Sequence, residues 1–301
     1  MALKIGVYVD AENTRLHGGY AMRYDVLREF AARGGDESIR LNVYAAFDHI
    51  EAEDNPAYAP RKRRFFSHIR DYGFKVTEKA VRRGRDEFGN EFHRANVELD
   101  MACDMLLQSA SLDRIVVVTG DGDFARVVRA LQNKGCRVEV VGFENVSPEL
   151  RREADLFVSG FLIPDLLPNP RNRSRGRWCE AGSRVRGVCC NFNPDKRVGN
   201  FRVMKTISPG LWVTDTRREE SSYESIFFSA GALPSSLDLD RLPSHDLVFE
   251  FDLEDPDRPG QHKIARNIDI RFDYSRRPAD ETLDDVEDEP EDDEASDAGD
   301  E

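Results

Sequence analysis

Short apolar runs alternate with amphipathic segments along the first half of the chain. Residues 115–119 are mostly β-branched and are apolar at odd and even positions alike, which predicts a strand buried on both faces. Four more strands are expected at residues 4–9, 40–47, 74–76 and 137–141, and helices at residues 24–32, 61–72, 96–106, 124–134 and 147–150. This alternation predicts an α/β domain built on a doubly wound parallel sheet.

The pattern changes after residue 163. Prolines and arginines dominate residues 164–183, and short strands separated by turns follow at residues 186–192, 200–206, 225–228, 247–252 and 264–271. Five short strands without a long helix predict a small all-β barrel of the OB type. We therefore expect an α/β domain at residues 1–163, a linker at 164–183, a barrel at 184–275 and a tail at 276–301.

Charge is distributed unevenly along the chain. The net charge is −14, but residues 279–301 hold fourteen Asp or Glu and no Lys or Arg. The rest of the chain keeps 43 of the 57 acidic residues and all 43 basic ones, so it is neutral overall. An acidic tail with few apolar residues is expected to be disordered. The acidic total therefore does not exclude a polyanionic partner for the neutral body.

Cysteine usage and hydropathy indicate the cellular compartment in which the protein is expected. The five cysteines are odd in number and lack C-x-x-C spacing, which argues against structural zinc and against a disulfide framework. No apolar run approaches the roughly 18 residues of a membrane span, and the N-terminus lacks a basic-plus-apolar leader. The sequence predicts a cytoplasmic protein with no membrane segment.

Acidic side chains gather where two predicted strands end and along one helix. They are Asp10, with Asn13, after the first strand; Glu98, Asp100 and Asp104 in the helix; and Asp121 and Asp123 after the strand at residues 115–119. The carboxyl ends of strands in an open α/β sheet are where such folds place their ligands. A simpler interpretation of the last pair makes Asp121 a turn residue and Asp123 a helix N-cap.

The spacing of these carboxylates favours a bound cation. Asp100 and Asp104 are four residues apart and share one helix face, where like charges destabilise a helix by a few tenths of a kcal/mol. Carboxylates clustered around a hard divalent ion such as Mg²⁺ or Mn²⁺ are a familiar solution. Such an ion lowers the pKa of a bound water and neutralises charge on a phosphodiester.

Three motifs carry a family resemblance. They are Val-Asp-Ala-Glu-Asn at residues 9–13, Asn-Val-Glu-Leu-Asp-Met-Ala-Cys-Asp at residues 96–104 and Thr-Gly-Asp-Gly-Asp-Phe at residues 119–124. In this order they resemble the NYN domains of the PIN-like nuclease superfamily, in particular the LabA-like group, over roughly residues 3–162. The resemblance implies a PIN-like fold and a metal-dependent ribonuclease, with Mg²⁺ or Mn²⁺ as cofactor and single-stranded RNA as partner.

The resemblance also implies roles for individual residues. Asp10, Asp104 and Asp121 match acidic site residues that hold metal, and Asn13 matches the polar partner of the first aspartate. Glu98, Asp100 and Asp123 are expected as further ligands or water-positioning bases, which makes Asp10, Asn13, Asp104, Asp121 and Asp123 the predicted catalytic set. Glu98 stands where the family often has Asp, and Arg94 stands in the place of a frequent lysine.

Basic residues near these motifs are candidates for RNA contact. They are Arg61, Lys62, Arg82, Arg83 and Arg94. For any one of them taken alone, a solvated surface charge is the better explanation. As a set beside an acidic pocket, they are suited to hold phosphates of an RNA backbone.

The barrel region resembles a cold-shock domain over about residues 184–271. The resemblance rests on Gly-Val-Cys-Cys-Asn-Phe-Asn at residues 187–193, Ser-Ile-Phe-Phe-Ser-Ala at 225–230 and Ala-Arg-Asn-Ile at 265–268. Such domains bind single strands by stacking bases on aromatic side chains. Asn191 and Ser225 replace two of those aromatics, while Phe192, Phe227 and Phe228 remain as candidates that are equally suited to a barrel core.

Two other functions stay open. The segments around Asp10 and Asp121 superficially resemble haloacid-dehalogenase phosphatases, but Glu12 replaces their acid/base aspartate and the acidic helix would serve no purpose there. The other alternative is a non-catalytic RNA-binding or regulatory protein with a vestigial site. The motifs do not specify the RNA target, the endo- or exonucleolytic mode, or whether the protein is a homo-oligomer.

Overall fold

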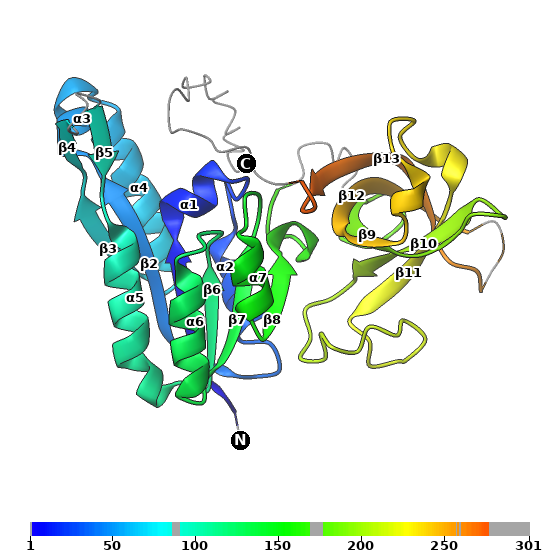
Figure 1. The fold of residues 1–301 in the computed structure, drawn as a ribbon, viewed down its shortest axis with the longest axis horizontal. Coiled ribbons are helices and arrows are strands. Elements are labelled where there is room, and N and C mark those ends of the chain that lie inside the picture. The colour runs from blue at the N-terminus through cyan, green and yellow to red at the C-terminus, as the bar shows by residue number, and fades with distance from the viewer. Residues whose placement is uncertain (1, 86–90, 169–176, 257, 259, 277–301) are drawn as a thin grey trace, which may run out of the picture.

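The computed structural model describes residues 2–85, 91–168, 177–256, 258 and 260–276. An α/β domain and a β-barrel lie side by side (Figure 1). Among the described residues, no helix is long and apolar enough to cross a membrane. The two parts correspond to the two folded regions expected from the sequence.

The α/β domain is built on a six-stranded sheet in the order β3-β2-β1-β6-β7-β8, and every neighbouring pair is parallel. Its strands are β1 (Lys4–Asp10), β2 (Glu37–Phe47), β3 (Lys75–Ala80), β6 (Arg114–Val118), β7 (Arg137–Gly142) and β8 (Leu156–Ser159). A separate antiparallel hairpin is formed by β4 (Arg82–Arg85) and β5 (Glu91–Arg94). The predicted parallel α/β sheet is confirmed.

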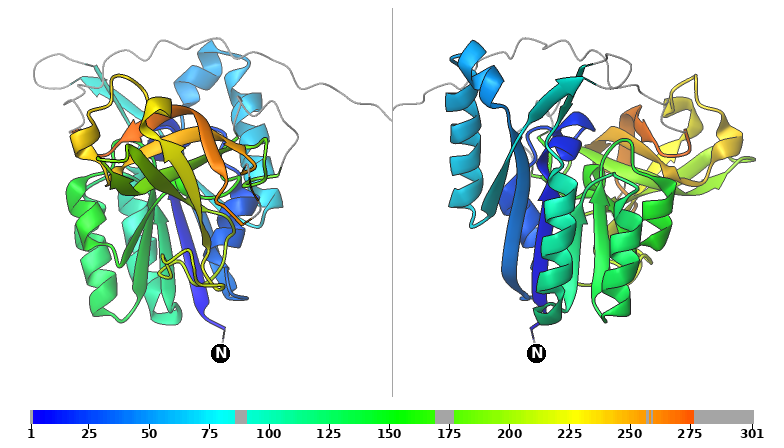
Figure 2. Two further views of the ribbon diagram at one scale, coloured as in Figure 1. Left: turned by 90° about the vertical axis from the view of Figure 1, so that its right-hand side faces the viewer. Right: turned by 60° about the vertical axis from the view of Figure 1, so that its left-hand side comes forward.

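Helices cover both faces of this sheet (Figure 2). The helices are α1 (Ala11–Leu16), α2 (Tyr24–Ala31), α3 (His49–Asp54), α4 (Tyr58–Asp71), α5 (Val97–Gln108), α6 (Phe124–Asn133) and α7 (Pro148–Glu153), with short 3₁₀ turns η1 (Ser109–Ser111) and η2 (Gly160–Leu162). Apolar residues of α2 and α4 pack on one face, and those of α5, α6 and α7 on the other. Both faces of the central strands are therefore buried, which explains their continuous apolar runs.

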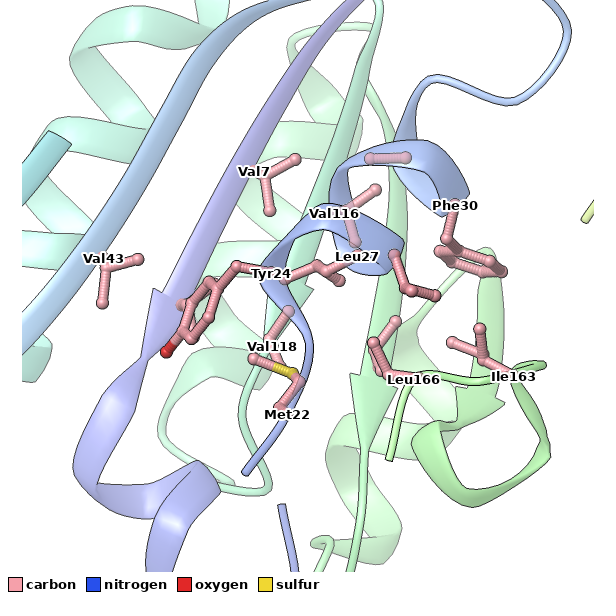
Figure 3. Packing of buried hydrophobic residues seen from close by; sticks show 14 of the residues in the cluster. Val7, Met22, Tyr24, Leu27, Phe30, Val43, Val116, Val118, Ile163 and Leu166 are labelled. Carbon is pink, nitrogen blue, oxygen red and sulfur yellow. The ribbon is translucent and has the colours of Figure 1, made fainter. Parts of the chain in front are cut away.

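Packing on the α2 face is tight and apolar. Leu27 and Phe30 of α2 are 0% exposed and belong to one apolar cluster with Val7 and Val116 of the central strands (Figure 3). Tyr24 makes an edge-to-face contact with Phe74, with the ring centroids 5.4 Å apart. This face fixes the sheet so that the ends of β1 and β6 lie next to each other.

The sequence pattern missed three elements of this domain. Helices α1 and α3 follow β1 and β2 directly, and the short strand β8 pairs with β7 at the far edge of the sheet. Part of the expected linker also belongs to the domain, because Leu166 and Leu167 are buried in its core. Short helices and an edge strand carry too few periodic positions to stand out in the sequence.

The second part is a closed five-stranded barrel in the order β10-β11-β13-β12-β9. Its strands are β9 (Arg184–Asn193), β10 (Val198–Met204), β11 (Tyr223–Ser229), β12 (Ser244–Glu254) and β13 (Ile264–Asp273), with 3₁₀ turns η3 (Ala230–Ala232) and η4 (Leu239–Arg241). Phe201 lies at the centre of the core and stacks on Phe228 and Phe251, with ring centroids 4.2 Å and 4.6 Å apart. The second all-β unit that the sequence predicts is thus present.

The barrel packs directly on the α/β domain. Met204, Leu211 and Val248 of the barrel are buried in the same apolar cluster as the α2 face of the sheet. Polar contacts surround this packing: Arg151 Nη2 donates to Asp246 Oδ1 at 2.8 Å, and the hydroxyl oxygens of Tyr274 and Ser159 are hydrogen-bonded at 2.9 Å. A shared apolar core predicts that the two domains hold a fixed relative orientation.

A buried ion pair lies within the α2 face. Arg33, just after α2, donates through Nη2 to both carboxylate oxygens of Glu139 on β7, at 2.7 Å to Oε1 and 2.5 Å to Oε2. Both side chains are at most 2% exposed. Arg137 Nε also donates to Glu139 Oε1, at 3.0 Å. Removing Arg33 would leave the buried Glu139 charge with only the more exposed Arg137 as a partner.

We predict that Arg33→Met lowers the free energy of unfolding by roughly 3–5 kcal/mol, measured by urea titration. Replacing both partners, as in Arg33→Met/Glu139→Leu, should restore most of the loss because no buried charge remains. Arg129→Met, which removes an exposed pair with Glu153, is the matched control and should change stability little. A double variant no more stable than the single one would contradict this account.

Candidate active site

Asp10 is the last residue of β1 and the N-cap of α1. Its side chain is 3% exposed and accepts a hydrogen bond from the Asn13 backbone N–H at 3.0 Å. Burial raises the pKa of this carboxyl group from 3.8 to about 7, and the nearby charges of Glu98, Asp121 and Glu12 act in the same direction. Asp10 is thus a buried acid surrounded by other acids.

The loop after β6 is connected to α1 by a side-chain hydrogen bond. Asn13 Oδ1 accepts from the Gly120 N–H at 2.7 Å. Within the loop, Thr119 Oγ1 accepts from the Asp121 N–H at 3.2 Å, and Asp121 Oδ1 accepts from the Asp123 N–H at 2.9 Å. Asp123 holds the N-cap position of α6 without a side-chain capping bond and is exposed.

Gly120 is required by a close backbone approach. A Cβ at this position would lie 2.8 Å from the carbonyl oxygen of Asn145, in the loop between β7 and α7. The same loop returns a bond, because the Ser147 N–H donates to the Gly120 carbonyl at 2.9 Å. The Gly-Asp-Gly-Asp loop is therefore held from both sides, by α1 and by the loop after β7.

Glu98 lies in the first turn of α5. The chain enters this helix through Asn96, which has a positive φ of 46°, a conformation that asparagine tolerates better than most residues. Glu98 is exposed, but its charge raises the pKa of Asp10. The start of α5 therefore faces the end of β1, as the sequence predicts.

Asp104 lies two turns further along α5 and has its own partner. The Tyr44 hydroxyl donates to Asp104 Oδ2 at 2.7 Å. Burial raises the pKa of Tyr44, and the bond to Asp104 raises it further. Tyr44 pairs with Asp10 across β2 and β1, so Asp104 and Asp10 lie on the same face of the sheet.

Asp100 points toward the edge strand instead. Lys79 Nζ of β3 lies 2.6 Å from Asp100 Oδ2, and both side chains are about one-third exposed. The structure thus brings Asp10, Glu98 and Asp121 into electrostatic contact, while Asp100 and Asp104 are held by separate partners. Among the described residues, no three Asp, Glu, His or Cys side chains converge closely enough to bind one metal ion together.

Two of the predicted RNA-contacting residues form intramolecular ion pairs. Lys62 Nζ lies 2.7 Å from Glu12 Oε1, and Arg83 Nη2 lies 2.6 Å from Asp48 Oδ2. Burial alone would raise the pKa of Glu12, but Lys62 and Arg15 lower it overall. Lys62 and Arg15 therefore hold Glu12, one of the acidic neighbours of Asp10, in place.

The other basic candidates differ from these two. Arg61 on α4 and Arg82 on β4 are exposed. Arg94 ends β5, but its side chain lies outside the described residues, as does the run of arginines at residues 171–175. Arg61 and Arg82 therefore remain available for a phosphate backbone.

The aromatic candidates of the barrel fall into two classes. Phe228 is 0% exposed in the barrel core and has no face available for a base, so stacking was the wrong expectation for this residue. Phe192 is half-buried and lies parallel to Phe228, with ring centroids 6.2 Å apart. Phe227 is also half-buried, between the inward-facing Ile226 and Phe228, so strand alternation turns it outward.

Three residues near the carboxylates were missed by sequence reasoning. They are Thr119, which fixes the Asp121 backbone, Tyr44, which binds Asp104, and Lys79, which pairs with Asp100. Strand parity would have placed Tyr44 on the same face as Asp10. The pairing of Lys79 depends on how α5 lies on β1 and β2, next to the edge strand β3, and nothing in the local sequence encodes that position.

The raised pKa of Asp10 predicts a pH dependence of stability. Without a divalent ion, the folded protein keeps this proton up to about pH 7, whereas the unfolded chain releases it near pH 3.8. The folded state binds more protons over that interval, so stability falls as pH rises from 4 to 7. A shift of about three pKa units corresponds to at most ~4 kcal/mol.

We expect Asp10→Asn, measured in EDTA by urea unfolding, to lose less stability than wild type between pH 4 and pH 8. Asparagine retains the oxygen that accepts from Asn13 and carries no titrating proton. Asp195→Asn, in the exposed turn between β9 and β10, should behave like wild type. If the free energy of unfolding depends on pH identically in wild type and Asp10→Asn, ionisation of Asp10 does not destabilise the folded state.

Comparison with known proteins identifies the family of the first domain. Residues 4–165 match the NYN domain. The chain is 26% identical over 162 residues to the Low amplitude and bright protein LabA of Synechococcus elongatus, a match that covers 52% of this chain and 82% of LabA. A crystal structure of a protein of unknown function from Vibrio parahaemolyticus is 25% identical with a TM-score of 0.44, covering 52% of this chain and 93% of that one. Because the NYN match extends over more than half of the chain and includes all three acidic motifs, the chain belongs to the NYN domain family.

Proposed function

We propose that this protein hydrolyses RNA in a reaction that depends on a divalent metal ion at the carboxyl edge of the sheet. The NYN domain suggests a nuclease-like, RNA-related function and nucleic-acid binding. The observation that carries the proposal is Asp10, a carboxylate 3% exposed whose strongest charged neighbours are Glu98, Asp121 and Glu12. Such an arrangement is unfavourable at neutral pH unless a cation or protons neutralise it.

The donor set suits Mg²⁺ or Mn²⁺. All the groups near Asp10 are hard carboxylate oxygens, and Mg²⁺ typically binds one or two protein carboxylates while it keeps several waters. Asp10 and Asp121 would hold the ion, with Glu98 reaching it directly or through water. The absence of a three-residue cluster among the described residues is compatible with such a water-rich site. The bound ion would lower the pKa of a water and neutralise charge on the phosphodiester.

The remaining predicted residues take positioning roles in this proposal. Asn13 holds the Gly120 backbone and thereby sets the distance between Asp10 and Asp121. Asp104, oriented by Tyr44, lies on the same face and is suited to position a water. Asp123 is exposed beside Asp121, at the entrance to the site. Asp100 would contribute only if its pair with Lys79 opened.

The barrel is proposed as an accessory RNA-contacting module of the OB type. With its strands numbered in chain order, the closed order is 1-2-3-5-4, and the third and fifth strands are the parallel pair. OB barrels use the face of their second and third strands for single strands. Here that face carries Phe227 and Arg202, and the Arg202 guanidinium lies over the Tyr223 ring at 5.3 Å.

A non-catalytic RNA-binding protein is the second candidate. It is favoured by the absence of three converging metal ligands among the described residues and by the closed Lys79–Asp100 pair. A phosphatase is supported less, because Glu12, which would have to act as an acid, is paired with Lys62 and Arg15.

Cleavage of labelled single-stranded RNA tests the proposal. Wild type should cleave with Mn²⁺ and not with EDTA, and Asp121→Asn should lose roughly 10²-fold or more in rate, since a metal supplies several kcal/mol of charge stabilisation. Asp195→Asn is the control. Hydrolysis of p-nitrophenyl phosphate without RNA cleavage would indicate a phosphatase, and RNA binding without cleavage would indicate the non-catalytic protein.

We also predict that RNA affinity at the barrel depends more on charge than on stacking, since Phe227 is only half-exposed and Asn191 and Ser225 replace two aromatics. Arg202→Gln should weaken binding of single-stranded RNA and reduce its salt dependence by about 0.7 in the slope of log K against log salt. Fluorescence anisotropy over a salt series measures both. A larger loss in Phe227→Ala than in Arg202→Gln would show that stacking dominates.

A further inference from the structure

A second polar pocket lies on the same face of the sheet as Asp104, in the amino-terminal half of the strands. It has a volume of about 350 Å³ and is lined by Ile39, Arg40, Leu41, Asn42, Gly73, Lys75 and Gln108. These residues come from β2, from the start of β3 and from the last residue of α5. The pocket is thus formed by three elements that already position the carboxylates.

Register places its polar side chains together. Arg40 and Asn42 are two residues apart on β2 and therefore face the same side as Tyr44, which binds Asp104. Lys75 is the direct partner of Asn42 in the β2–β3 pairing. Because α5 covers β1 and β2 but not the edge strand, Lys75 stays exposed at the open side of the pocket.

The back wall of the pocket presents hydrogen-bond donors. Gln108 Oε1 accepts from the Tyr8 hydroxyl at 3.0 Å and from Asn42 Nδ2 at 3.4 Å. Its oxygen is used on two donors, and no acceptor for its NH₂ group is found among the described residues, so that group is left to donate to a ligand. Asn42 is itself 3% exposed. Two nearly fixed amide groups therefore form the interior end of this cavity.

Two cations complete the lining. Arg40 Nη1 donates to the Ile39 carbonyl at 2.8 Å. Burial raises the pKa of Tyr8, and the positive charge of Arg40 opposes part of that rise. Lys75 Nζ has no ion-pair or hydrogen-bond partner within the described ranges, and none of the seven lining residues is acidic. The pocket is thus positive and rich in donors, next to a site that is negative.

A lysine on an edge strand also prevents edge-to-edge pairing of sheets. That role needs only a charge at the edge. It does not account for the arginine on the neighbouring strand or for the buried Asn42 and half-buried Gln108 behind them.

We propose that this pocket binds a phosphate monoester, carried either by a nucleoside monophosphate or by the phosphorylated end of an RNA. Phosphate offers several acceptor oxygens, which suit an arginine fork, a lysine point charge and amide N–H groups. The volume is at the lower end of the range for small-ligand pockets. Binding here requires neither a divalent ion nor cleavage, so the proposal is independent of the hydrolytic activity.

Isothermal titration of the full-length protein in EDTA at low salt tests this proposal. Adenosine 5′-monophosphate should bind, and adenosine, which lacks the phosphate, should not. Two short RNAs of one sequence, with and without a 5′-phosphate, identify the source. Preference for the phosphorylated RNA assigns the pocket to an RNA end, and binding of the mononucleotide alone assigns it to free nucleotides.

Variants locate the bound phosphate. Lys75→Gln removes an exposed charge and should weaken binding of the monophosphate about tenfold, as expected for one charge-assisted hydrogen bond. Gln108→Glu keeps the oxygen that Tyr8 and Asn42 need, replaces the donors by a negative charge and should weaken binding at least as much. Lys196→Gln, an exposed lysine in the β9–β10 turn, should leave the affinity unchanged.

Three results would overturn the proposal. They are no binding of the monophosphate by wild type at millimolar concentration, equal binding of adenosine and its monophosphate, and unchanged affinity in Lys75→Gln. Because Lys75 is exposed, loss of folding would not explain a negative result for that variant.

Discussion

A carboxylate that is almost inaccessible to water must be neutralised by a proton or a cation. Asp10, at the end of the central strand β1, is such a carboxylate. Its single backbone hydrogen bond from Asn13 offsets only part of the cost of burial, because its pKa still rises to about 7. The surrounding structure brings acidic groups closer instead of basic ones: Asn13 fixes the Asp121 loop through Gly120, and α5 directs Glu98 toward the same point. The fold therefore holds charges together that repel one another, an arrangement typical of a functional site rather than of a stability device.

The loop between β7 and α7 links this site to the barrel. Residues 143–147 contact the Asp121 loop through Asn145 and Ser147, next to Gly120. At its other end, the Phe143 carbonyl accepts from the Tyr274 hydroxyl, and Glu144 accepts from Arg271 of β13 at 3.2 Å. One short loop thus contacts both the carboxylates and the barrel. Since the domains also share an apolar core, an RNA strand bound on the barrel would meet the site at a fixed distance.

Much of this arrangement could be predicted from the sequence, and the failures have physical reasons. Strands buried on both faces gave strong signals, so β1, β6 and β7 were found with nearly correct bounds, and their order placed Asp10 and Asp121 at one edge. The partners of the carboxylates were not predictable, because Tyr44 and Lys79 act across distances set by how α5 packs on the sheet. Phe228 shows the same limit, since a phenylalanine in a short strand fits a core as well as a binding face, and only closure of the barrel decides.

Helix α5 contributes side chains to both polar sites on this face. Met101 and Met105 pack on the sheet, but the same side of the helix also carries Asp104 and Gln108, bound to Tyr44 and Tyr8. Apolar packing alone tolerates small slides of a helix, whereas these directional bonds to buried tyrosines fix its register on β1 and β2. Glu98 at one end of α5 and Gln108 at the other therefore move as one body. Helix α5 is thus the physical link between the donor-lined pocket at Gln108 and the carboxylates near Glu98.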